Sequence, residues 1–169
     1  MEVSESPDFN GFYAAELRPV LRFLYKQGAS WDECWDAAQE AFYEALRHWE
    51  DLRSPRAWVR KTALRYHIHQ CERRNDELRR IGAADWWLPR PSFGEIELKE
   101  DKVQVLVAIA ALPQRQREVM AWHYDGYSPQ EIAHLIGIPD DAVRSSLYQA
   151  RKTLKARLSS QQEGGCHER

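Results

Sequence analysis

Two helical stripes of apolar residues follow one another near the C-terminal end of the chain, separated by one glycine. Ser128, Pro129 and Glu131 have the spacing of an N-cap, an N1 and an N3 residue in a capping box, which predicts a helix start. Gly137 ends this helix, where a left-handed residue is needed. A second helix is predicted from Asp140, because acidic residues favour a helix N-terminus. Its apolar positions recur at i, i+4, i+7, i+11 and i+15, which places them on one narrow stripe: Val143, Leu147, Ala150, Leu154 and Leu158.

Three more helices are predicted before residue 75. The first covers residues 9–27 and ends at Gly28, and Pro19 within it predicts a kink or a split. The second covers residues 30–49. The third starts at Ser54-Pro55, an N-cap followed by a proline at N1, and ends near Arg74. The expected inward positions of the second and third helices are Ala38, Ala41, Phe42, Ala45, Leu46 and Trp49, and Trp58, Ala63 and Ile68.

The middle of the chain has a different composition. Glycines and prolines interrupt residues 75–101, which predicts a linker with no long helix before about residue 95. Trp86 and Trp87 lie in it and are expected either to pack on a neighbouring domain or to anchor a partner protein. Helices are then predicted over residues 101–111 and 114–124. In the second of these the expected inward residues are Val119, Met120 and either Trp122 or Tyr124.

All predicted elements are helices, so the expected fold class is all-α. A three-helix bundle and a four-helix domain that ends in a helix-turn-helix are joined by a flexible linker. The boundaries are 1–74 for the first domain, 75–101 for the linker, 102–158 for the second domain and 159–169 for a frayed tail. No apolar run approaches the ~20 residues of a membrane span, and no secretory signal is present, so no membrane insertion is expected.

Positive charge is local in a chain whose formal net charge is −2. From Arg144 to Arg157 there are five Lys and Arg residues and no acidic one. From Arg56 to Arg74 six basic residues accompany one acidic residue, Glu72. Two basic helices on either side of an acidic middle indicate two contact points on a long polyanion.

The polar faces of these helices suggest what they bind. A helix-turn-helix with donors on its outer face is typical of duplex DNA binding, and the alternative is an ordinary amphipathic surface helix. The third helix mixes basic and aromatic residues, as single-stranded nucleic acid requires, although Trp58 and Tyr66 could instead be core residues. The polar face of the second helix, which includes Arg47, can be explained by exposure to solvent alone.

Enzymatic chemistry has little support. His67 and Cys71 share a helix face but His69 does not, so they offer at most two of the four ligands of a structural zinc. Cys166-His167 lies in the predicted tail. There is no phosphate-binding loop, no Gly-x-Ser-x-Gly and no triad. We therefore expect no enzyme activity, no cofactor, no metal and no small-molecule substrate. Three separated cysteines without Cys-x-x-Cys indicate a reducing compartment.

Several motifs together resemble a known family. Residues 112–119 (LPQRQREV), 124–133 (YDGYSPQEIA) and 143–152 (VRSSLYQARK) are similar to region 4 of bacterial sigma factors. Residues 36–42 (DAAQEAF) and 54–74 are similar to parts of region 2. Two regions separated by a short linker resemble the extracytoplasmic-function (ECF) subgroup.

The resemblance implies a cytoplasmic transcription initiation factor that binds core RNA polymerase and promoter DNA and is held inactive by an anti-sigma factor. It implies a polymerase-binding face made of Asp36, Gln39, Glu40 and Tyr43. It implies contacts with the minus-ten element from Arg56, Trp58, Arg60, Lys61, Arg65, Tyr66, His69 and Arg73. It implies contacts with the minus-thirty-five element from Arg144, Ser145, Ser146, Tyr148, Gln149 and Lys152.

The sequence departs from the family at a few of these positions. Arg65 and His69 stand where the family usually has Asn and Asp, and Ser146 and Gln149 replace frequent basic residues. These changes put the minus-ten preference and the strength of phosphate attraction in question. Two other functions stay open: a stand-alone helix-turn-helix regulator, and a sigma-like interaction protein without promoter function.

Overall fold

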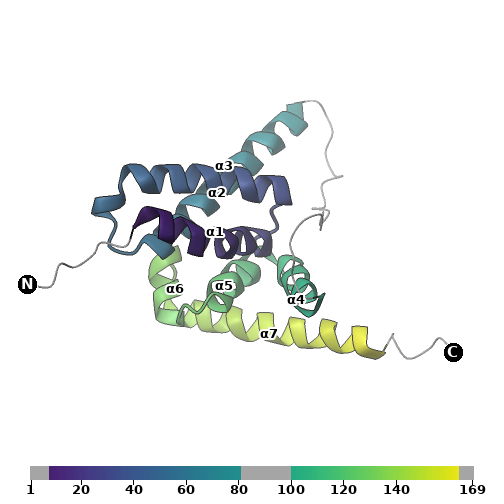
Figure 1. Cartoon of the computed structure of the whole chain (residues 1–169). Helices are drawn as coiled ribbons and strands as arrows, with labels where there is room; N and C mark the ends of the chain where they lie inside the picture. Colours follow the sequence, from purple (N-terminus) through teal and green to yellow (C-terminus); the bar gives the residue numbers. More distant parts are fainter. Residues whose placement is uncertain (1–7, 81–99, 164–169) are drawn as a thin grey trace, which may run out of the picture. The chain divides into compact units, whose positions relative to one another are not determined.

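The structure, a computed structural model, describes residues 8–80 and 100–163, and every regular element in these ranges is helical (Figure 1). Helices α1 to α3 form one compact unit, apart from the last residue of α1, and α4 to α7 form a second. The elements are α1 (Phe9–Lys26), α2 (Trp31–Arg47), a short 3-10 helix (Trp49–Asp51), α3 (Pro55–Arg80), α4 (Glu100–Ala110), α5 (Gln114–Tyr124), α6 (Pro129–Ile136) and α7 (Asp140–Glu163). No described helix is long and apolar enough to cross a membrane.

Small residues let α2 pack closely on α3 in the first unit. Four alanines of α2 are fully buried, and Val59 and Ala63 of α3 are buried as well. Because alanine adds only a methyl group, helices that meet through alanines can approach closely. The buried alanines of α2 are Ala37, Ala38, Ala41 and Ala45.

Aromatic rings join α1 to α2 and to the short helix after it. The Phe12 ring lies 6.0 Å from that of Phe42 and 4.9 Å from that of Trp49, measured between ring centroids. Phe9 meets Trp49 edge to face at 5.2 Å. Such contacts add to the hydrophobic burial of the rings. Trp49, which follows α2, is thereby tied to the start of α1.

The second unit is organised around α7, on which α5 and α6 pack. The stripe predicted for this helix is confirmed at Val143, Leu147 and Ala150, which are buried. Trp122 is 1% exposed and Tyr124 is 49% exposed, so Trp122 is the inward residue of α5. The Trp122 ring also meets Tyr127 edge to face, with 5.0 Å between centroids.

Helix ends were predicted well where a capping residue or glycine marks them. Gly28 has a φ of +91°, and α1 ends just before it. Pro19 lies inside a continuous α1, so the alternative of a split does not occur. Two helices run further than predicted: α3 continues past Arg74 to Arg80, and α7 continues past Leu158 to Glu163.

Both extensions have the same cause, since neither segment contains the glycine or proline that would stop a helix.

The inward positions predicted for Leu46 and Ile68 are wrong, because these side chains are 52% and 41% exposed. Trp86, Trp87 and Cys166-His167 lie outside the described residues.

Candidate nucleic-acid interface

Helix α6 has a capped start and ends at a glycine turn that leads into α7. Ser128 Oγ accepts from the backbone N–H of Glu131 at 3.2 Å, and the Glu131 carboxylate accepts from the N–H of Ser128 at 2.8 Å. This reciprocal bonding confirms the predicted capping box. Gly137 has a φ of +72°, in the left-handed region that favours glycine. The turn therefore fixes where α7 begins relative to α6.

The outer face of α7 carries most of the residues predicted to contact the minus-thirty-five element. Val143 and Leu147 are buried on one side of the helix, and Arg144 and Ser145 between them are exposed. Tyr148 is 65% exposed. Ser146 is half-buried and is the least accessible of the six. The exposed members are Arg144, Ser145, Tyr148, Gln149 and Lys152.

The arginines of α7 have different surroundings. Arg144 Nε donates to the carboxylate of Asp140, one turn earlier, at 2.8 Å. Arg151 lies 2.9 Å from the ring of His123 in α5, and Arg157 donates to the backbone carbonyl of Ala111 at 3.0 Å. Arg151 and Arg157 therefore attach α7 to its own unit, whereas Arg144 belongs to the outer face.

Helix α3 presents a basic stripe with two half-buried aromatic residues beside it. Four exposed polar residues recur at intervals of four, which places them along one side of the helix. Trp58 and Tyr66 are neither core nor fully exposed, so each keeps part of its ring accessible. The residues of the stripe are Lys61, Arg65, His69 and Arg73.

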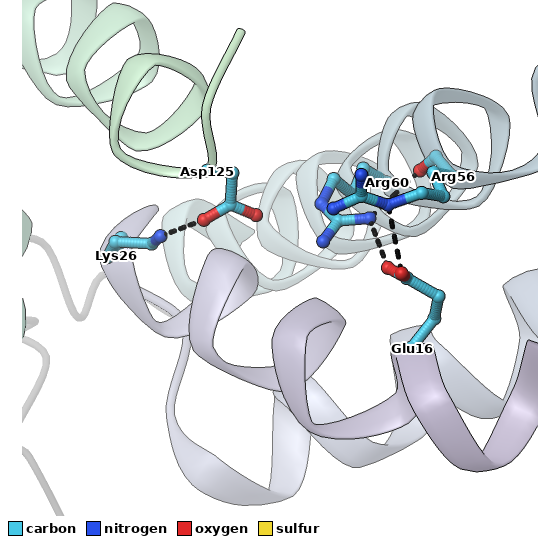
Figure 2. Close-up of polar contacts among 5 residues, drawn as sticks. All are labelled: Glu16, Lys26, Arg56, Arg60 and Asp125. Atoms are coloured by element: carbon cyan, nitrogen blue, oxygen red, sulfur yellow. Dashed lines mark hydrogen bonds and ion pairs between the residues drawn. The ribbon is translucent and has the colours of Figure 1, made fainter.

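Glu16 of α1 pairs with the two remaining arginines predicted to contact the minus-ten element, Arg56 and Arg60, which differ in burial. One carboxylate oxygen lies 2.9 Å from Arg56 Nε and the other 2.8 Å from Arg60 Nη1 (Figure 2). The Arg56 side chain is 60% exposed, but that of Arg60 is 1% exposed. Arg60 also donates to the Arg56 carbonyl at 3.1 Å. The structure therefore places Arg60 inside the first unit as a buried cation and not on the exposed surface with Arg56.

Glu44 of α2 contacts the basic stripe of α3 in the way that Glu16 contacts Arg56 and Arg60, as a carboxylate from another helix. Its carboxylate accepts a hydrogen bond from the Tyr66 hydroxyl at 3.0 Å and lies 3.5 Å from the Arg65 guanidinium. The hydrogen bond to Glu44 raises the pKa of the Tyr66 phenol, so the hydroxyl keeps its proton and remains a donor. Glu44 therefore holds two side chains of the predicted minus-ten surface.

The polar face of α2 is accessible. Asp36, Gln39 and Glu40 are exposed, and Tyr43 is 61% exposed. Leu46 extends this face by an apolar side chain, one turn after Tyr43. Exposed aromatic and apolar side chains such as Tyr43 and Leu46, with polar groups around them, match the apolar centre and polar rim of a protein-binding surface.

The sequence did not point to the carboxylates that hold the arginines. Glu16 and Glu44 lie on other helices than the arginines they meet, at separations that no local spacing rule covers. Asp140 could have been found, since Asp140 and Arg144 are four residues apart on one helix.

The two thiols in the described part of the chain have different surroundings. Burial is the largest cause that raises the pKa of the Cys34 thiol well above its ordinary value, so it stays protonated. Cys71 Sγ lies 3.7 Å from the His67 ring, as their shared helix face predicts. Within residues 8–80 and 100–163, no group of three or more His, Cys, Asp or Glu residues could hold a metal ion.

Two parts of the chain match protein-family models. Residues 12–77 match Sigma-70 region 2, and residues 102–154 match Sigma-70, region 4. The chain is also 34% identical over 136 residues to a protein of Xanthomonas campestris pv. campestris named as a probable RNA polymerase sigma factor, RfaY. That alignment covers 73% of this chain and 33% of the relative, so the chain spans about a third of the relative's length.

Two solved structures have a similar fold. One is the sigma factor RpoE of Bartonella quintana in complex with the anti-sigma factor NepR, with a TM-score of 0.71 and 18% identity over 90% of this chain and 97% of that one. The other is CnrH in complex with the cytosolic domain of CnrY, with a TM-score of 0.58 and 20% identity over 90% and 88% of the two chains. At these identities the likeness supports the fold.

Proposed function

The chain belongs to the sigma-70 family, with its regions 2 and 4, and from that premise we propose that it is an ECF-type initiation factor that directs core RNA polymerase to promoters. The chemistry of RNA synthesis then belongs to the polymerase, and the chain contributes binding surfaces. It acts where the polymerase acts, in the cytoplasm.

One observation carries this proposal: the two matched regions each expose a basic helix face, and the first also exposes a separate polar face on α2. Base edges in the major groove are distinguished by donors and acceptors such as those on the outer face of α7. Unpaired bases stack on aromatic rings while Lys and Arg follow the backbone, and α3 offers both. A stand-alone duplex binder would need the outer face of α7, but it would have no use for the basic and aromatic face of α3 or the polar face of α2.

We propose the exposed face of α2 as the polymerase-binding surface and α3 as the helix that holds the opened minus-ten strand. The outer face of α7 would contact the minus-thirty-five duplex. An anti-sigma partner is proposed as well, because the RpoE structure with a similar fold is a complex with the anti-sigma factor NepR. Such a partner would compete with polymerase or DNA for the same faces.

A run-off transcription assay with core polymerase tests the proposal. The full chain should produce promoter-specific transcripts, whereas the double substitution Asp36→Ala with Gln39→Ala should weaken capture of core polymerase and lower the transcript yield. A matched control, Asp141→Ala with Gln130→Ala, removes the same chemical groups from exposed positions in the second unit. It should leave capture of the core enzyme unchanged.

The other functions predict different results. Duplex binding by the chain alone, without any transcripts, would favour a stand-alone regulator. Capture of polymerase or an anti-sigma protein without transcripts would favour an interaction protein. Equal capture by the Asp36/Gln39 variant and its control would show that the α2 face is assigned wrongly.

A further inference from the structure

The Asp140–Arg144 pair lies at the start of α7, where a helix-turn-helix inserts into the major groove. We infer that Asp140 is a positioning residue that turns the end of the Arg144 guanidinium toward a guanine of the upstream promoter element. This inference rests on the proposed function and assigns one base contact within it.

The geometry of the hydrogen bond supports this role. Asp140 Oδ2 accepts from Arg144 Nε at 2.8 Å, and Nε is the donor on the side of the guanidinium. The two terminal nitrogens, Nη1 and Nη2, are left as a planar pair of parallel donors. That pair matches the O6 and N7 acceptors of guanine, which an arginine contacts with two hydrogen bonds. The Arg144 side chain is 59% exposed, so its end can reach a ligand.

Folding gives this pair no other evident purpose. The Arg144 side chain is 59% exposed and that of Asp140 is 41% exposed, and an ion pair that water reaches between residues four apart contributes little to stability. Asp140 is not needed to neutralise the helix N-terminus either, because Asp141 lies in the same first turn. What the pair does achieve is to restrict a flexible side chain before it binds.

The carboxylate also argues against a simple phosphate contact. A negative charge 2.8 Å from Arg144 weakens its attraction for the DNA backbone. Lys152, two turns further along the same face, has no ion pair among residues 8–80 and 100–163 and is better suited to a phosphate. The pair therefore favours recognition of a base edge at Arg144 over general electrostatic attraction.

Run-off transcription from a template library with a randomised upstream element tests the inference, using the full chain and core polymerase. Each template carries a barcode in its transcribed part that identifies its upstream element, so the sequenced transcripts give the base preference at each position. The wild-type chain should prefer guanine at one position, and Arg144→Ala should reduce that preference by roughly 5- to 150-fold, as expected for a lost bidentate contact. Asp140→Ala should reduce it at the same position and nowhere else. Asp140→Asn, which keeps an acceptor for Nε, should restore part of it.

Asp141→Ala is the matched control. It removes the same charge from the same turn, so it reproduces any effect on the helix N-terminus or on phosphate attraction, but it should leave the guanine preference unchanged. Equal effects of Asp140→Ala and Asp141→Ala would overturn the positioning role, and so would a changed preference at a different position from that of Arg144→Ala. If the wild-type chain yields no transcripts, the proposed function fails, and the inference fails with it.

Discussion

Replacing Glu16 by alanine tests how the buried charge of the first unit is held. Glu16 is 12% exposed and is paired with Arg60, whose side chain is 1% exposed. The same carboxylate also meets Arg56, which is 60% exposed. One acid therefore has a buried and an exposed partner. Glu16→Ala removes both ion pairs, whereas Arg56→Ala removes the exposed one alone.

The expected magnitudes differ because of burial. Removing one partner of a buried ion pair costs about 3–5 kcal/mol, since the other charge remains in a poorly solvated place. Arg60 keeps its hydrogen bond to the Arg56 carbonyl, so for Glu16→Ala we expect the lower end, about 3 kcal/mol. Arg56→Ala removes only the exposed pair, and its expected cost is about 1 kcal/mol or less.

Native-state hydrogen exchange of the full chain measures both changes. A loss of about 3 kcal/mol should speed exchange of the protected amides in α1 and α3 by roughly 100-fold, because each 1.4 kcal/mol is a factor of ten. Amides of α7 serve as an internal control and should keep their rates. Equal, small effects of Glu16→Ala and Arg56→Ala would refute the argument that burial makes the Glu16–Arg60 pair important for stability.

Two further predictions concern the helix ends and pH. Ser128→Ala should lower the stability of the second unit by about 1 kcal/mol, because it removes the side chain of a capping box, and Ser30→Ala should do the same to the first unit. Thermal melts, with hydrogen exchange read out for each unit, measure both changes. A loss of stability in the unit that does not carry the substitution would contradict this prediction. Burial raises the pKa of Glu33, but the Ser30 N–H and Arg74 outweigh it and hold the pKa below its ordinary 4.5. The contribution of Glu33 to stability is therefore present above pH 4.5 and is lost as the pH falls through the lowered pKa, so Glu33→Gln should flatten the acid side of the stability curve of the first unit, and an unchanged curve would contradict the assignment.

Much of the second unit could be predicted because its signals are local. The capping box at Ser128, the left-handed Gly137 and the buried stripe of α7 each depend on residues a few positions apart. The same reasoning placed the ends of α5 correctly, between Pro113 and the turn at Gly126.

What could not be predicted depends on distant partners. Arg60 follows Arg56 by four residues on α3, but its side chain is 1% exposed and that of Arg56 is 60% exposed. Their shared partner, Glu16, lies on another helix, so spacing along α3 does not reveal the difference. Periodicity likewise predicted that Leu46 and Ile68 face inward, although no neighbouring element covers them fully. A one-dimensional pattern gives the angle of a side chain around its helix but not what, if anything, packs over that angle.

The alanines of α2 have a mechanical consequence under the proposed function. A methyl side chain has no rotamers to adjust, so buried alanines leave less room for the distance between the backbones of α2 and α3 to vary. One outer surface of this pair would grip the enzyme and the other would grip the separated strand. The helix pair would then act as a stiff spacer. The distance between the polymerase surface on α2 and the DNA strand on α3 would be set by a row of buried methyl groups.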